Sequence, residues 1–88
     1  MKKILFFELR LCPHCKKARR FIDQLQADNP LYQSLEIEYI DERKNKELAA
    51  QYDYYLVPSL YIDNQKVHEG KMKAIEEMEE IFKKALSV

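Results

Sequence analysis

Two cysteines are the residues of this chain best suited to chemistry. Cys12 and Cys15 are the only cysteines among 88 residues, and they lie three positions apart in the run Cys-Pro-His-Cys. Two thiols at this spacing can exchange with a disulfide, because the first attacks it and the second resolves the mixed disulfide that results. The same pair could instead supply two of the four ligands of a structural zinc site, or be two small buried apolar residues.

The place of the cysteines between a strand and a helix favours the redox interpretation. Residues 3–8 are apolar and a helical pattern follows the motif, so Cys12 is predicted where a strand ends and a helix begins. Pro13 suits the first helical turn, and the free backbone N–H groups there favour a thiolate on Cys12. Cys15 returns to the same side of the helix and is expected to be more buried. An imidazolium at His14 would stabilise the thiolate further, unless this residue is simply exposed at the helix start.

The first half of the chain predicts a strand, a helix and a second strand. Residues 3–8 are apolar on both alternating faces, which is typical of a central strand covered on both sides. An amphipathic helix of about 15 residues follows and ends at Asn29, because the residue before Pro30 is disfavoured in the α region. Residues 35–40 alternate apolar and acidic side chains, so they are predicted to form a strand parallel to the first. The predicted inner face of the helix consists of Ala18, Phe21, Ile22 and Leu25.

The second half predicts a short helix, a hairpin and a final helix. The short helix is expected at residues 44–52, and the two strands of the hairpin at residues 59–63 and 66–69, joined by a turn at residues 63–66. Gly70 is expected to end the sheet. The final helix is acidic early and basic late, as the helix dipole favours. Its predicted inner stripe consists of Met72, Ile75, Met78, Phe82 and Leu86.

Composition and charge indicate one small domain over residues 1–88. The apolar fraction of 47% and the single glycine argue against disorder. Fifteen basic residues balance fifteen acidic ones, so no net charge marks a nucleic-acid or membrane-surface protein, and the basic run at residues 16–20 is expected to be a solvated helix face. The apolar run near the N-terminus is too short for a signal peptide or a membrane span. We therefore expect a cytoplasmic protein with reduced thiols.

Four sequence features together resemble the thioredoxin superfamily. They are CPHC after an apolar strand, ELAAQY in the second helix, VPSLYID at the third strand and a glycine after the fourth. The length, with one strand–helix–strand unit before the hairpin and last helix, looks like a glutaredoxin or a glutaredoxin-like thioredoxin. The resemblance covers residues 3–86. It implies a thioredoxin-like α/β fold, with the order β-α-β-α-β-β-α and a four-stranded mixed sheet flanked by helices.

The resemblance also implies roles for residues outside the cysteine motif. In this superfamily the proline that matches Pro58 has a cis peptide bond and lies against the cysteine pair. The residue before it, here Val57, hydrogen-bonds the main chain of an extended substrate. Arg10 and Lys16 are candidates for binding a glutathione carboxylate. Gly70 matches one glycine of the loop that binds glutathione in glutaredoxins.

We therefore expect a monomeric thiol–disulfide oxidoreductase that needs no bound cofactor or metal. Cys12 would be the nucleophile and Cys15 the resolving thiol, with Pro13 and His14 tuning the pair. The expected substrates are disulfides of proteins or mixed disulfides with glutathione. The electron donor is either glutathione, as a co-substrate, or thioredoxin reductase. Two alternatives stay open: a module that binds a metal or an iron–sulfur cluster across two copies, and a redox-inactive module that binds partners in the groove at Pro58.

Overall fold

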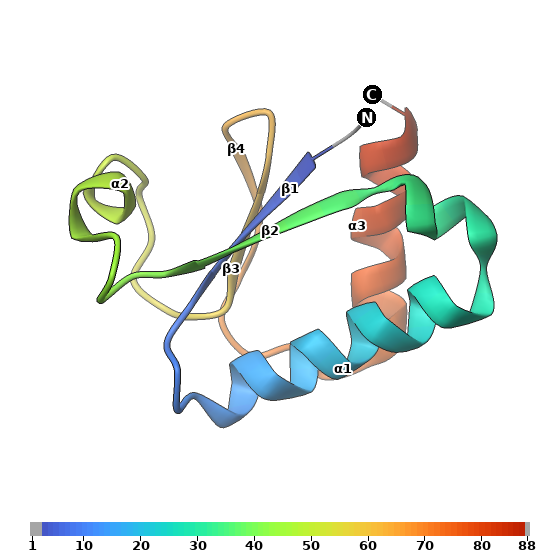
Figure 1. Ribbon diagram of the computed structural model, residues 1–88, viewed down its shortest axis with the longest axis horizontal. Helices are drawn as coiled ribbons and strands as arrows, with labels where there is room; N and C mark the ends of the chain where they lie inside the picture. Colours follow the sequence, from blue (N-terminus) through green and yellow to red (C-terminus); the bar gives the residue numbers. More distant parts are fainter. Residues whose placement is uncertain (1–2, 88) are drawn as a thin grey trace.

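The computed structural model describes residues 3–87, which form a mixed four-stranded sheet with helices on both faces (Figure 1). The strand order is β2-β1-β3-β4, and β1 pairs in parallel with β2 and antiparallel with β3. The predicted fold class and element order are confirmed, with one 3-10 helix added. The elements are β1 (Lys3–Glu8), α1 (Pro13–Asp28), the 3-10 helix η1 (Pro30–Ser34), β2 (Glu36–Asp41), α2 (Lys46–Ala50), β3 (Ser59–Ile62), β4 (Gln65–Glu69) and α3 (Ile75–Ser87).

The strand β1 lies in the middle of the sheet because both of its faces are apolar. Ile4 and Phe6 are fully buried in the core beneath α1 and α3, whereas Phe7 is fully buried on the side of α2. The prediction of a central strand is therefore confirmed. The carboxyl end of this strand leads directly to the cysteine motif.

The helices α1 and α3 cover one face of the sheet and enclose the larger core. Within residues 3–87 no helix combines the length and the apolar character of a membrane span. The predicted inner stripe of the final helix is wrong at both ends, because Met72, although buried, precedes α3 and Leu86 is 37% exposed. By spacing Leu86 belongs to the same stripe as Phe82, but it is the second-last residue of α3, and Ala85 is the last buried residue of the helix. The buried residues of α3 are Met78, Ile81, Phe82 and Ala85.

The helix α2 is shorter than the predicted range of 44–52. The backbone N–H groups of Lys44 and Asn45 both donate to the carbonyl of Asp41, at 3.1 and 3.0 Å, so a turn precedes the helix. The helix therefore begins at Lys46 and ends at Ala50.

The hairpin between β3 and β4 turns one residue earlier than predicted. Asp63 and Asn64 occupy its two central positions with φ angles of 50° and 65°. Positive φ at both positions is typical of the tight turn that joins antiparallel strands, and Asp and Asn tolerate it. The strand β4 consequently begins at Gln65 rather than Lys66.

A β-bulge interrupts the pairing of β3 with β4. Leu60 pairs with His68 but Tyr61 pairs with Lys66, so Val67 is an extra residue in β4. The bulge reverses the alternation of side chains along β4. As a result Lys66 and Glu69 lie on the same face of the sheet, and their side chains form an ion pair at 2.6 Å.

Candidate functional site

The N-terminus of α1 brings the two cysteines together. Cys12 is the N-cap residue, with extended backbone, and its sulfur accepts a hydrogen bond from the backbone N–H of Cys15 at 3.2 Å. The sulfur thus takes the place of the side-chain oxygen that usually caps a helix. Pro13 holds the first helical position, as predicted, and the N–H of Lys16 donates to the Cys12 carbonyl at 3.1 Å to begin the helix.

The two thiols have different surroundings, although they are neighbours. Cys12 is half-buried, whereas Cys15 is 1% exposed and belongs to the core under α1. Burial, with a further contribution from the adjacent Cys12 side chain, raises the pKa of Cys15 to about 12. Cys15 is therefore a protonated thiol at neutral pH, and Cys12 is the one that a large partner can reach.

Val57, the residue before Pro58, lies beside Cys12. The peptide bond between Val57 and Pro58 is cis, which confirms that part of the prediction. The Val57 carbonyl oxygen is 4.0 Å from the Cys12 sulfur. Pro58 is buried, and its carbonyl accepts a hydrogen bond from the backbone N–H of Gly70 at 2.8 Å.

Gly70 supports this proline from the neighbouring strand. Its φ of +89° lies in the region that favours glycine, and a Cβ at this position would come within 3.2 Å of Leu56 Cδ1. Because the N–H of Gly70 already bonds Pro58, the residue helps to fix the proline rather than standing free in the groove.

A carboxylate that the sequence analysis did not identify holds the segment in front of the proline. We call residues 53–57 the pre-proline loop. One carboxylate oxygen of Glu69 accepts hydrogen bonds from the backbone N–H groups of Tyr55 and Leu56, and the other accepts from Lys66. The Lys66 ammonium and then these two N–H groups lower the pKa of Glu69 to about 2. The charged carboxylate therefore fixes the loop at any pH near neutral.

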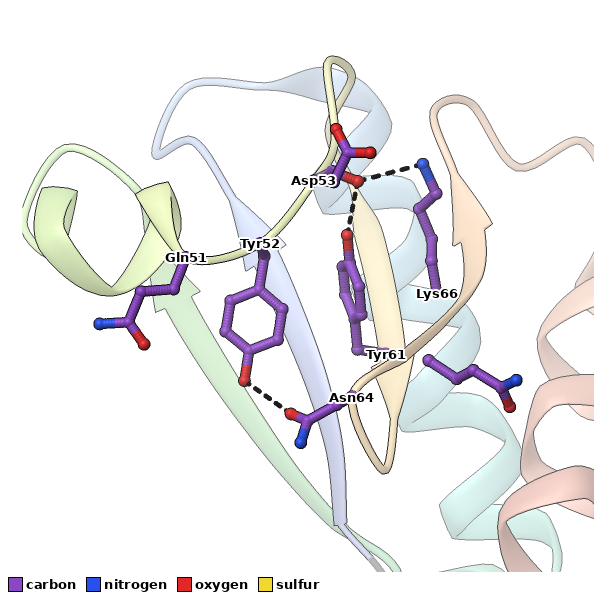
Figure 2. Close-up of a pocket in the computed structure, with 7 residues that line it drawn as sticks. Gln51, Tyr52, Asp53, Tyr61, Asn64 and Lys66 are labelled. Atoms are coloured by element: carbon purple, nitrogen blue, oxygen red, sulfur yellow. Dashed lines mark hydrogen bonds between the residues drawn. The ribbon is translucent and has the colours of Figure 1, made fainter.

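Side chains of β3 and β4 also hold the start of the pre-proline loop (Figure 2). The carbonyl of Asp53 accepts hydrogen bonds from the Tyr61 hydroxyl at 2.7 Å and from the Lys66 ammonium at 3.1 Å. Ser59 donates from its hydroxyl to the carbonyl of Leu56. The sequence did not identify Lys66 as part of this support, because the bulge at Val67 decides which side chains of β4 face the loop.

The other residues predicted for the site lie around the cysteines but do not form one cluster. His14 and Lys16 are both exposed on the first turn of α1. Arg10 lines a groove of about 620 Å³ that also includes Cys12, whereas Lys16 and Gly70 do not line it. A second hollow, of about 470 Å³, lies beside Tyr61 and the residues drawn in Figure 2. Neither cysteine lines this second hollow.

Across the part of the chain that the structure describes, no group of three or more His, Cys, Asp or Glu side chains is arranged to hold a metal ion. The motif itself contributes two sulfurs, and a structural zinc site takes four ligands. What the arrangement can do with its own atoms is exchange disulfides. An accessible sulfur lies over a helix N-terminus, a buried thiol lies within one turn of it, and a proline loop closes the other side.

Comparison with known proteins agrees with this geometry. The sequence matches the family described as thioredoxin domain over residues 2–83. A thioredoxin of Methanocaldococcus jannaschii is 33% identical over 61 residues, which is 69% of each chain. A mutant thioredoxin from Halobacterium salinarum has a TM-score of 0.70 at 18% identity, over 96% of this chain and 74% of that one. Reduced desulfothioredoxin from Desulfovibrio vulgaris Hildenborough has a TM-score of 0.70 at 24% identity, over 94% and 80%.

The two solved structures support the fold, and the family match together with the archaeal relative supports the chemistry. These three relatives are thioredoxins, so the thioredoxin side of the sequence resemblance is confirmed, while its glutaredoxin side stays a prediction. The chain belongs to the thioredoxin-domain family of thiol–disulfide oxidoreductases.

Proposed function

We propose that this protein reduces disulfides through a dithiol mechanism in which Cys12 attacks and Cys15 resolves. The observation that carries the proposal is the contrast between the two sulfurs. Cys12 is partly exposed and its sulfur accepts the N–H of Cys15 at 3.2 Å, whereas Cys15 is buried in the core with a pKa of about 12. An accessible attacking group beside a protected second thiol is what a two-step exchange needs.

The exchange forms two S–S bonds and breaks two. The Cys12 thiolate attacks one sulfur of a substrate disulfide, and the other substrate sulfur leaves and takes up a proton. Cys15 then gives up its proton and attacks the Cys12 sulfur, which releases the second substrate thiol. The substrate disulfide is reduced to two thiols, and the Cys12–Cys15 pair is oxidised to a disulfide.

We assign supporting roles to the residues around the two sulfurs. Pro13 starts the helix that presents Cys12, and His14 adds a group beside it that can carry positive charge. Val57 offers its main chain to an extended substrate, and its carbonyl oxygen, 4.0 Å from the Cys12 sulfur, supports this role. Pro58, after the cis peptide bond, shapes the groove beside it. Arg10 borders the same groove. Lys16 and Gly70 act more remotely, the first through its charge and the second by holding Pro58.

We further propose that the substrates are protein disulfides and that the protein works as a monomer in the cytoplasm without a bound cofactor. The archaeal thioredoxin relative favours thioredoxin reductase as the electron donor, with glutathione as the other candidate. The balanced charge of the whole chain gives no support to nucleic-acid or membrane binding.

The test is the reduction potential of the cysteine pair together with two single variants. The protein is equilibrated in glutathione buffers of known potential, and its free thiols are trapped and counted. A value near about −270 mV would place it with thioredoxin, and about −200 to −230 mV with glutaredoxins. We expect Cys12→Ser to abolish disulfide reduction, and Cys15→Ser to accumulate a mixed disulfide with the substrate.

Failure to form a disulfide at any potential would contradict the proposed function. An absorption band in the visible region of the purified protein would then favour an iron–sulfur module shared by two copies. If neither disulfide nor cluster formed, the chain would be a redox-inactive binding module.

A further inference from the structure

The groove beside Cys12 is lined mainly by positively charged side chains among its polar residues. Its lining comes from the segment before α1 and from the end of β2 with the turn that follows. Three of the lining residues are cations, namely Arg10, Arg43 and Lys44. Asp41 is the one anion in this lining, among the residues that the structure describes. The groove therefore has an excess of two positive charges next to the reactive sulfur.

These cations are not used inside the protein. The ion pairs within residues 3–87 involve other basic residues, such as Arg19 with Glu8 and Lys66 with Glu69, and none includes Arg10, Arg43 or Lys44. The carboxylate of Asp41 accepts a hydrogen bond from the backbone N–H of Arg43 at 2.9 Å. The three cationic side chains are exposed and can pair with an external anion.

Large apolar side chains are exposed in the two segments that lead to this sulfur and to the Val57 carbonyl beside it. Leu11, which directly precedes Cys12 and lines the groove, is 79% exposed. Tyr55 is 91% exposed and Leu56 60%, and both precede Val57, whose carbonyl lies 4.0 Å from the Cys12 sulfur. Exposed apolar residues rimmed by charges are typical of surfaces that bind a polypeptide.

We propose that this groove selects protein disulfides whose cysteine is flanked by acidic residues. The proposal rests on the proposed function and adds the substrate class. Carboxylates of such a segment would lie near Arg10, Arg43 and Lys44, while its apolar side chains contact Leu11 and the exposed end of the pre-proline loop. Opposite charges on the two partners mainly raise the rate of association.

The test compares reporter peptides that differ only in charge. Each peptide has one cysteine activated as a 2-pyridyl disulfide, flanked by glutamates in one peptide and by glutamines in the other. Attack by Cys12 forms a disulfide with the peptide and releases pyridine-2-thione, whose absorbance gives the rate. We expect the acidic peptide to react about three- to tenfold faster at low salt. The ratio should fall towards one in 1 M salt, where the Debye length is about 3 Å.

Two double variants locate the effect on the surface. We expect Arg43→Gln with Lys44→Gln to lower the ratio of acidic to neutral rates to about one. Lys83→Gln with Lys84→Gln removes the same charge from exposed positions of α3, which does not line the groove, and should leave the ratio unchanged.

Each remaining outcome has a definite meaning. Equal rates for the acidic and neutral peptides in an active protein would overturn the substrate class and leave the proposed function intact. A ratio that the α3 variant lowers as much as the groove variant would overturn the location. The 2-pyridyl disulfide of glutathione is a further reporter. If it alone reacted faster than the neutral peptide, and Arg43 and Lys44 were needed for that higher rate, the groove would bind a tripeptide instead of a protein segment. If no reporter reacted, the proposed function itself would be wrong.

Discussion

The two faces of the sheet are covered in different ways. On one face α1, with 16 residues, and α3, with 13, enclose a core that includes Phe6, Phe82 and Cys15 (Figure 1). On the other face α2 has five residues, and aromatic rings fill the space that a longer helix would cover. The ring of Phe7 lies 4.8 to 5.6 Å from three tyrosine rings, those of Tyr52, Tyr54 and Tyr61.

The tyrosine face uses its hydroxyl groups to hold loops next to the site, whereas in the other core the hydroxyl of Tyr32 bonds Glu79 of α3. The hydroxyl of Tyr61 bonds Asp53 at the start of the pre-proline loop, and that of Tyr52 bonds Asn64 in the hairpin turn (Figure 2). The hydroxyl of Tyr54 is buried without a protein partner in the described part of the chain, and burial raises its pKa to about 12. We infer that one face mainly stabilises the fold, whereas the other mainly positions the proline beside the cysteines.

The largest expected effect comes from removing a ring on each face in turn. Phe82 is fully buried, so Phe82→Ala should lower the free energy of unfolding by about 3–5 kcal/mol. Tyr52 is only partly buried, so Tyr52→Ala should lower the free energy of unfolding by about 1–2 kcal/mol. Urea denaturation of the reduced proteins measures both values. Leu86→Ala, at an exposed position of α3, is the control and should change stability by about 0.5 kcal/mol or less.

Equal losses at Phe82 and Tyr52 would contradict the division between the two faces. Such a result would mean that the aromatic cluster around Phe7 carries as much of the stability as the core under the long helices. The face covered by the short helix α2 would then stabilise the fold as much as the face covered by α1 and α3.

An alkaline titration should show an intermediate effect on stability from the buried thiol of the core under α1 and α3. The pKa of Cys15 is raised from about 9 to about 12 in the folded state, so the unfolded chain loses this proton first. The contribution of Cys15 to the stability of the reduced protein is therefore fully present below about pH 9 and is lost as the pH rises towards 12. Urea denaturation of wild type and Cys15→Ala across this range isolates the contribution. A parallel decline in both proteins would show that Cys15 is not the group responsible.

The sequence predicted most of the fold because its strongest patterns are local. Three patterns each predicted an element or its end from a few neighbouring residues. They are the two apolar faces of β1, the helical spacing of Ala18, Ile22 and Leu25, and the proline after Asn29. The cysteine motif could be placed at a helix start for the same reason. Where the pattern was weak, as at the two ends of α2, the predicted bounds were wrong.

The support of the pre-proline loop could not be predicted, because it depends on contacts between distant strands. A regular strand would place Lys66 and Glu69 on opposite faces, and only the extra residue Val67 brings them together. No local pattern signals that bulge. The charge of Arg43 and Lys44 was visible in the sequence, but their place beside Cys12 follows from the parallel pairing of β1 with β2.

The smallest expected effect on stability, and the most specific one, concerns Glu69. We expect Glu69→Ala to accelerate amide hydrogen exchange at Tyr55 and Leu56 by about fivefold or more, which is the effect of losing roughly one hydrogen bond. Glu69→Gln keeps an oxygen that can accept both N–H groups, so exchange should stay closer to that of wild type. Glu80→Ala, an exposed carboxylate on α3, is the matched control. Exchange rates that Glu69→Ala leaves unchanged would contradict the role of this carboxylate.

The pH dependence of the same exchange rates separates charge from shape. The pKa of Glu69 is lowered from its usual 4.5 to about 2, so its contribution is present above pH 4.5 and is lost as the pH falls through about 2. Protection of Tyr55 and Leu56 should therefore persist at pH 4, where an ordinary glutamate is largely protonated.

If Glu69→Ala also slows the reaction of peptide disulfides while Phe82→Leu does not, the loop acts on substrate independently of the core. That result would establish the tyrosine face as the part of the sheet that serves the site.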